Sequence, residues 1–342
     1  MNTNDRTTGE ATPATGDQID DEGSPTFDER AFIRSARAKS MRRTTALASL
    51  VVLVALCVSA GGWVAWNIGI QAQSNRVTAY QYELVSLSQP NTFISGTGRT
   101  DLQFPGARNT YAAYRPVGSR PAPRGDVTIE FEIWGGEVAS TAGELMSWQA
   151  PVREFSGAQM APALRFLYPL EASAASVPEE AQLLAAATVV TRQRLEAAPA
   201  SATAEIAVSF KARKTLAELE AWLPSGVTLN WGAVDVWAPE KGPIVTADGS
   251  MVGIAFVGPD GIASPVARTQ LEKDVVDDLH FIAELAPKGT ADRCTTSADF
   301  LAQNGVRYYG AVVTGSVSDI RKLLAGPDAS CATLGFVVEP WE

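Results

Sequence analysis

Residues 44–75 form a continuous stretch without charge that is apolar over most of its length. A helix crosses the hydrocarbon core of a bilayer with about 20 apolar residues, and residues 46–70 supply them. Every peptide group in such a helix bonds within the helix, so none is left facing lipid. The pattern predicts one transmembrane helix over residues 44–70.

Basic residues are concentrated on the N-terminal side of this segment. Lys and Arg are retained on the cytoplasmic side of a membrane, so we expect a cytoplasmic N-terminus and an extracytoplasmic C-terminal domain in a single-pass protein of the cell membrane. Trp63 and Trp66 fall near the outer end, where indole rings suit the headgroup layer. The basic residues are Arg30, Arg34, Arg37, Lys39, Arg42 and Arg43.

A cleaved secretory signal is the alternative interpretation, because Val58-Ser59-Ala60 before Gly61 resembles a cleavage site. Two features disfavour it. The leader of about 40 residues is longer than a signal peptide, and the apolar run continues past Ala60. We therefore expect a retained anchor.

The chain before the anchor divides into two segments. Residues 1–26 are small, polar and acidic with no apolar face, so we expect a disordered cytoplasmic tail. Residues 27–43 form a basic juxtamembrane segment in which apolar and basic residues alternate as in an amphipathic helix. This segment is either a collar that contacts anionic membrane lipid or a docking helix for a cytoplasmic partner, and the pattern alone favours the collar.

Beyond the anchor the pattern changes from strands to alternating strands and helices. Residues 77–175 are expected to form a β-rich, membrane-proximal region. Val127 to Trp134 alternates like a half-buried strand, and Asn91 to Gly125 is expected to be mostly loop with short strands.

Residues 176–342 carry a clearer pattern, opened by a predicted helix over residues 178–198. Two segments then read strand, short capped helix, strand, and we interpret them as βαβ-like units of one α/β (α+β) domain. Thr215 with Glu218, and Ser316 with Asp319, have the spacing of helix caps. The two segments are 204–237 and 306–341, and between them a strand over 251–257 and helices over 267–285 and 295–303 are predicted.

Charge excludes one class of function for the outer domain. The chain has 28 basic and 38 acidic residues, a net charge of −10, and residues 1–43 are nearly neutral. An acidic domain does not neutralise phosphate, so we expect no direct contact with nucleic acid.

The three cysteines are expected to differ in role. Cys57 lies within the apolar segment, where it is a small packing residue. Cys294 and Cys331 lie outside the membrane, where thiols oxidise, and we expect them to form a disulfide. Two separate buried thiols are the alternative.

The sequence offers little catalytic or metal-binding chemistry. His280 is the only histidine, so neither a Ser-His-Asp triad nor a zinc site of Cys/His type is expected. Asp274, Asp277 and Asp278 are expected to be a solvated acidic face rather than a cation site. Asn230 and Trp231 form a candidate ectodomain groove, because the polar neighbour suggests a strand edge. We expect no enzyme activity, no catalytic residues, no metal and no cofactor.

Residues 204–237 resemble the C-terminal domain of membrane-bound sigma-factor regulators. The resemblance lies in a strand that ends in Ser-Phe, a helix that begins at Thr, a Leu-Pro pair and a strand with Asn-Trp. The segment 88–98, with Gln89-Pro90-Asn91 as its recognisable core, is similar to the family's membrane-proximal region. The matching positions in the first segment are Ser209, Phe210, Thr215, Leu223, Pro224, Asn230 and Trp231.

The resemblance implies an anti-sigma factor that holds an extracytoplasmic-function sigma factor at its cytoplasmic stub, with an outer sensory domain and, in some arrangements, a second membrane protein. It makes the docking interpretation of residues 27–43 the favoured one. Alternatives are an anchored cell-envelope binding module without a role in transcription and an envelope hydrolase that uses carboxylates. The implied contacts are Phe27, Phe32, Ile33, Arg34 and Arg37.

Overall fold

The computed structural model describes residues 28–118, 120–132, 137–143, 163–169, 179–237, 245–246 and 251–339. The chain divides into two compact units, Met1–Val64 and Ala65–Glu342. The predicted disordered tail, residues 1–26, lies outside the described residues, as does Phe27.

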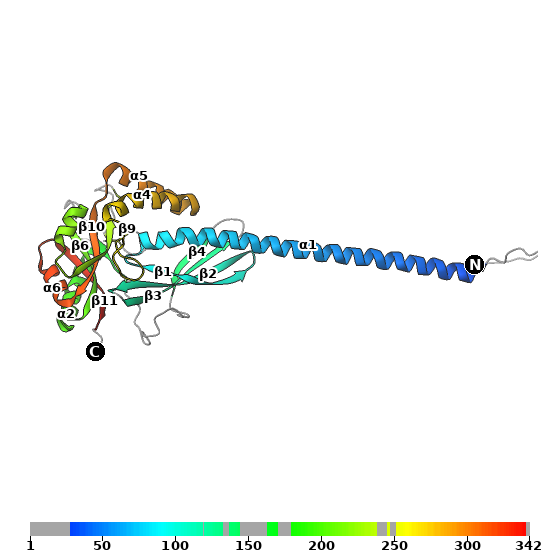
Figure 1. Cartoon of the computed structure of the whole chain (residues 1–342), viewed down its shortest axis with the longest axis horizontal. Helices are drawn as coiled ribbons and strands as arrows, with labels where there is room; N and C mark the ends of the chain where they lie inside the picture. The colour runs from blue at the N-terminus through cyan, green and yellow to red at the C-terminus, as the bar shows by residue number, and fades with distance from the viewer. Residues whose placement is uncertain are drawn as a thin grey trace, which may run out of the picture. The chain divides into compact units, whose positions relative to one another are not determined.

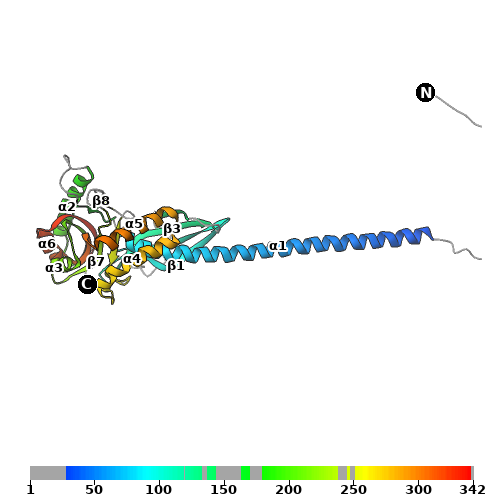
Figure 2. The ribbon, with the colours of Figure 1, turned by 90° about the horizontal axis from the view of Figure 1, so that it is seen from above.

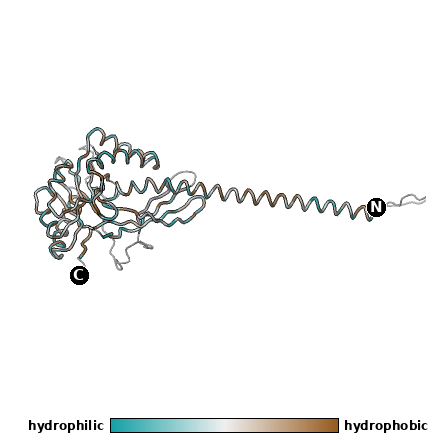
Figure 3. The backbone as a smooth tube through the Cα atoms, viewed as in Figure 1, coloured by the Kyte–Doolittle hydropathy of each residue, from teal (hydrophilic) through white to brown (hydrophobic). Residues whose placement is uncertain are grey.

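Helix α1 (Glu29–Ser88) runs without interruption for 60 residues. The Asp28 carboxylate accepts a hydrogen bond from the Ala31 amide at 3.0 Å, which caps the first turn. From Leu47 to Val64 the side chains are exposed and apolar, and Figure 3 shows this part of α1 in brown. Among the described residues α1 is the one helix long and apolar enough to cross a membrane.

Helix α1 continues well past the predicted end at residue 70. The reason is tertiary burial, because Ile70, Val77 and Tyr80 are each less than 5% exposed inside the second unit. Their spacing places them on one face of the helix. The β-rich region expected from residue 77 therefore begins with a helix.

A four-stranded antiparallel sheet follows, in the order β1-β2-β3-β4. The second half of α1 packs against it, with Val77 and Tyr80 beside Ile94, Tyr111 and Ile129 (Figures 1 and 2). Residues 91–125 thus form long strands, and the expectation of loops there is wrong. The strands are β1 (Phe93–Gln103), β2 (Gly106–Val117), β3 (Arg120–Glu132) and β4 (Glu137–Gly143).

The C-terminal part of the chain is built on a five-stranded sheet in the order β11-β6-β10-β7-β9. Neighbouring strands are all antiparallel. Strand β10 separates β6 from β7, and β6 separates β10 from β11, as in a split β-α-β-β-α-β arrangement. The strands are β6 (Thr203–Lys214), β7 (Val227–Val234), β9 (Val252–Ala255), β10 (Tyr308–Ser316) and β11 (Ala329–Val338).

Four helices bury one face of this sheet, and the larger hydrophobic core lies beneath them. On the opposite face, Phe166 and Tyr168 pack against Trp231 and Tyr309, and β5 (Phe166–Leu167) pairs there with β8 (Val245–Thr246). The helices are α3 (Leu216–Trp222), α4 (Arg268–Leu285), α5 (Lys288–Asn304) and α6 (Val317–Ala325).

The two predicted helix caps are confirmed. Thr215 and Glu218 form a reciprocal capping box at the start of α3. The Ser316 hydroxyl accepts a hydrogen bond from the Asp319 amide at 3.1 Å at the start of α6. Both caps fix where a strand ends and a core helix begins.

The predicted disulfide between Cys294 and Cys331 is wrong, since both thiols are free and buried. Cys331 is on β11, one edge of the sheet, whereas Cys294 lines a cavity with Val252 of β9, the other edge. The two edges are separated by about 19 Å at the usual strand spacing, and a disulfide requires Cα atoms within about 7 Å. Burial raises the pKa of both thiols, which keeps them protonated.

Candidate functional site

The stub residues lie on the first turns of α1. Phe32 is 58% exposed and Ile33 is 42% exposed, and Arg34 and Arg37 are exposed beside them. On a helix, Arg34 and Arg37 share a face. The described part of the stub is therefore a helical surface with two apolar side chains among basic ones, which suits packing against a partner rather than enclosing a small ligand.

The other end of α1 is embedded in the second unit. Leu87 is part of the core beneath the five-stranded sheet, and Leu84 packs against it. The indole nitrogen of Trp231 on β7 donates to the carbonyl of Ser86 at 3.0 Å. We call this contact, formed by Leu84, Ser86, Leu87 and Trp231, the helix seat. It joins the last turns of α1 directly to the C-terminal sheet.

Next to the helix seat lies a buried group of polar side chains, which we call the polar junction: Asn91, Arg115, Glu205 and Asn230. Asn91, in the turn after α1, donates to Glu205 Oε1 of β6 at 2.8 Å and to the Pro116 carbonyl of β2 at 3.0 Å. Its φ of 51° lies in the left-handed region, which asparagine tolerates better than most residues. The amide thus joins three elements at one point.

An ion pair completes the polar junction. A guanidinium nitrogen of Arg115 lies 3.6 Å from Glu205 Oε2, and the two side chains are 1% and 0% exposed. Gly335 of β11 has no side chain at a point where a Cβ would collide with the same carboxylate oxygen. Two opposite charges are therefore fully buried between the two sheets. Their mutual attraction offsets the free-energy cost of desolvation only if the geometry of the pair is good.

Asn230 belongs to this group rather than to a groove. Its amide donates to the Pro116 carbonyl at 3.3 Å and accepts from the Thr314 hydroxyl at 3.0 Å. The expectation of a strand edge is wrong, because β7 lies between β10 and β9. Asn230 and Trp231 are 2% and 0% exposed, so both side chains lie in the interior of the domain and do not line a groove.

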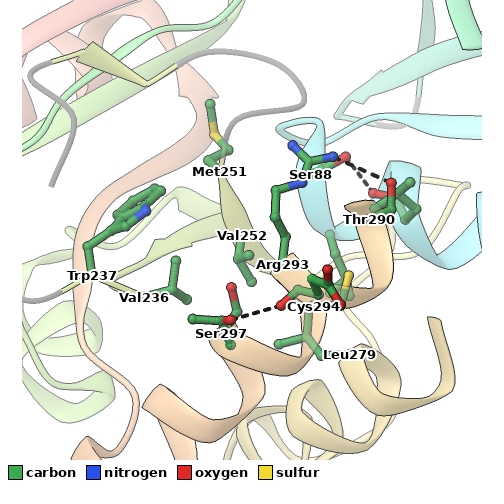
Figure 4. A pocket seen from close by; sticks show the side chains of 14 residues that line it. Ser88, Val236, Trp237, Met251, Val252, Leu279, Thr290, Arg293, Cys294 and Ser297 are labelled. Atoms are coloured by element: carbon green, nitrogen blue, oxygen red, sulfur yellow. Dashed lines mark hydrogen bonds between the residues drawn. The ribbon is translucent and has the colours of Figure 1, made fainter. Parts of the chain in front are cut away.

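A cavity of about 320 Å³ adjoins the helix seat, and Figure 4 shows its lining. One wall is the end of α1, and the others come from the strand segments around Val236 and Val252 and from α4 and α5. Most of the lining is apolar, with hydroxyl and charged groups from α5. The lining residues are Leu84, Leu87, Ser88, Val236, Trp237, Met251, Val252, Leu279, Thr290, Asp292, Arg293, Cys294, Thr296 and Ser297.

The contact between α1 and α4 is acidic. The Asp278 carboxyl on α4 has its pKa raised to about 6, first by burial and then by the nearby charges of Glu83 on α1 and of Asp274 and Asp277. Burial also raises the pKa of Glu83. This face is thus partly desolvated rather than freely solvated as expected.

The described residues do not assemble a metal site. Among them, no group of three or more His, Cys, Asp or Glu side chains is placed to hold a metal ion. His280 is exposed on α4. The helix seat and the polar junction connect the end of α1 to both sheets, and the cavity lies beside the helix seat.

Sequence reasoning missed the partners in this site. In the sequence, Asn91 stands out only as part of the Gln89-Pro90-Asn91 segment, and Arg115 and Glu205 belong to no local motif. Glu205 lies in the mainly apolar stretch from Ala204 to Phe210 of β6. A charged residue in such a stretch needs a partner when it is buried, and this is the signal that the sequence offers.

One of the comparisons with known proteins finds a match. Residues 195–336 match the family model described as sigma factor regulator C-terminal, a range that includes β6, β7, β10 and nearly all of β11. No curated protein and no solved structure matches the chain. Residues 195–336 are thus similar to the C-terminal domain of sigma factor regulators.

Proposed function

We propose that this protein is a single-pass membrane anti-sigma factor. Its cytoplasmic stub would hold an extracytoplasmic-function sigma factor, and its extracytoplasmic domain would sense the state of the envelope. The observation that carries the proposal is the continuity of α1, which joins the exposed Phe32–Ile33 surface to a helix seat inside the sigma factor regulator domain.

In this proposal the stub works by apolar anchoring. Phe32 and Ile33 fill pockets on the sigma factor, and Arg34 and Arg37 add charge that favours an acidic partner surface. Phe27, expected to contribute a third anchor, lies outside the described residues. Regulation follows if a change in the outer domain alters how α1 is held, because one continuous helix connects the two ends.

The test is co-purification of the full-length protein from membranes of cells that express it. The double variant Phe32→Asp/Ile33→Asp removes the apolar anchors, and Leu183→Asp on α2 (Glu179–Ala197) is the matched control, since Leu183 is 59% exposed. We expect a sigma factor with wild type and with the control, and its loss with the double variant. Equal recovery from all three would overturn the proposal.

A second candidate is an anchored envelope binding module without a transcriptional role, and the cavity beside the helix seat favours it. A mostly apolar cavity of this size can hold a small ligand. The same experiment separates the two candidates, because the binding module predicts no sigma factor in any preparation.

A further inference from the structure

The turn between β1 and β2 is exposed and apolar. Gln103 pairs with Gly106, so Phe104 and Pro105 form a two-residue turn. Phe104 is 80% exposed and Leu102, just before it, is 49% exposed. We call Leu102 to Pro105 the hairpin tip.

This composition is unusual for a turn in water. Two-residue hairpin turns in water favour Gly, Asn and Asp, which suit both the backbone geometry and the solvent. The hairpin tip instead presents a phenyl ring and a leucine side chain, which are stabilised by transfer from water to an apolar surrounding.

The position of the hairpin tip identifies that surrounding. The ring of Phe104 lies against the indole of Trp66 on α1, with centroids 6.2 Å apart. Trp66 directly follows Ala65, where the continuous exposed stretch of α1 ends, and Ile68 is the last exposed apolar side chain before the buried Ile70. From Leu47 to Val64 the helix rises about 27 Å, close to the roughly 30 Å thickness of the hydrocarbon core.

The boundary of the bilayer cannot lie much farther along the helix. Ile70 is 4% exposed because it packs in the core of the second unit. The membrane interface therefore falls near Trp63 and Trp66, and Phe104 lies at the level of Trp66.

We propose that the hairpin tip inserts Leu102 and Phe104 into the interfacial layer of the bilayer, as a second membrane contact of the outer domain. This inference rests on the proposed membrane anchor. The depth is limited by nearby charge, since exposed Glu132 pairs with Gly106 and the Arg99–Asp101 ion pair follows along β1. Insertion is thus confined to the headgroup and upper acyl region, about 5–10 Å deep.

Two contacts restrain the domain more than one does. With the anchor alone, the domain tilts together with α1 relative to the bilayer, whereas the hairpin tip as a second contact restrains this tilt. The first sheet then links the lipid contact to the polar junction. Strand β2 begins beside the hairpin tip, passes through Arg108 and reaches Arg115 of the polar junction.

Spin-label accessibility tests the proposal on the full-length protein in nanodiscs of phosphatidylethanolamine and phosphatidylglycerol. A nitroxide is attached at Phe104→Cys in a Cys57→Ser background, since Cys294 and Cys331 are buried. Leu53→Cys in the apolar part of α1 is the lipid control. Ile262→Cys is the aqueous control, because Ile262 is 65% exposed and adjacent Gly261 lies against Gly118, beyond the far end of β2.

We expect the ratio of oxygen to nickel-chelate accessibility at position 104 to be several-fold higher than at 262 and to stay below the ratio at 53, because the tip enters only the headgroup and upper acyl region. A label at 104 that behaves like 262, while the label at 53 is in lipid, overturns the hairpin contact and leaves the anchor intact. If the label at 53 also behaves like 262, the anchor fails and the proposed function fails with it. Leu102→Cys repeats the measurement at an independent position.

Discussion

The carboxylate of Glu205 has no access to solvent, and its charge is compensated within the polar junction by Arg115 and by the amide of Asn91. Such a pair gains little net free energy over apolar packing, but the loss of one partner is costly. The pair therefore enforces one arrangement of β2 against β6.

We predict that Arg115→Met lowers the free energy of unfolding by about 3–5 kcal/mol, because it leaves a buried carboxylate without its cation. Urea denaturation of the full-length protein in detergent measures the change. The double variant Arg115→Met/Glu205→Gln should recover part of the loss.

The control is Arg99→Met, which breaks an ion pair whose side chains are 73% and 38% exposed. Exposed pairs contribute about 0–1 kcal/mol. Equal effects of Arg99→Met and Arg115→Met would contradict a special role for the polar junction.

Asp278 gives a pH-dependent prediction. Its pKa is raised from the ordinary 3.8 to about 6, so the folded chain binds a proton that the unfolded chain releases, and stability falls as pH rises between these values. We expect Asp278→Asn to raise the melting temperature at about pH 7.5 and to have little effect near pH 4.

Thermal denaturation at both pH values checks this result. Asp299→Asn, on the exposed face of α5, controls for the general loss of one negative charge. A stabilisation by Asp278→Asn that is the same at both pH values would disagree with a raised pKa.

The sequence predicted hydrogen bonds between residues close in the chain better than contacts between residues far apart in it. Thr215 with Glu218 and Ser316 with Asp319 are three residues apart, and the caps follow from backbone geometry alone. Tertiary structure brings Arg115 and Glu205 together, and it also determines how far apart the two cysteines lie. The expected oxidising surroundings outside the membrane favoured a disulfide. Only the order of the strands reveals that the two thiols lie toward opposite edges of the five-stranded sheet.

At the scale of elements, helix α2 protects an edge strand. Thr188 accepts a hydrogen bond from the Ala332 amide at 2.9 Å, and Thr191 accepts one from the Leu334 amide at 3.0 Å. Threonine side chains thus satisfy the outward backbone groups of β11, which would otherwise be open to pairing with another chain.

We predict that Thr188→Val/Thr191→Val lowers the free energy of unfolding by about 2–4 kcal/mol, since two backbone amides lose their partners, and that it promotes aggregation. Chemical denaturation and light scattering measure the two effects. Thr188→Ser/Thr191→Ser keeps both hydroxyls and should behave much more like wild type. If valine and serine variants are equally stable, the hydroxyls do not protect the edge.

The elements differ in how well their sequence predicts them. Most strands and helices of residues 203–338 were predicted from alternation, and α3 and α6 also from their caps, whereas α5 begins at Lys288 rather than at residue 295. Residues 71–88 were missed because their helix is stabilised by the first sheet rather than by composition, and β1 and β2 were missed because Gly, Pro and Arg obscure their alternation.

At the scale of the whole molecule, the family match covers residues 195–336, whereas the proposed contact with the sigma factor lies more than 150 residues earlier. Helix α1 is the covalent link between them. The sequence predicted one apolar helix long enough to cross a membrane, but the helix seat on which the proposed regulation depends is visible only in the fold.

The most direct test of the proposed function is the transcript level of the genes controlled by the bound sigma factor. It is measured in unstressed cells that carry the wild-type chain, Phe32→Asp/Ile33→Asp or the control Leu183→Asp, with equal protein amounts in the membrane. We predict strong derepression with the double variant and none with the control. Unchanged transcription in cells with the double variant would contradict the anti-sigma function.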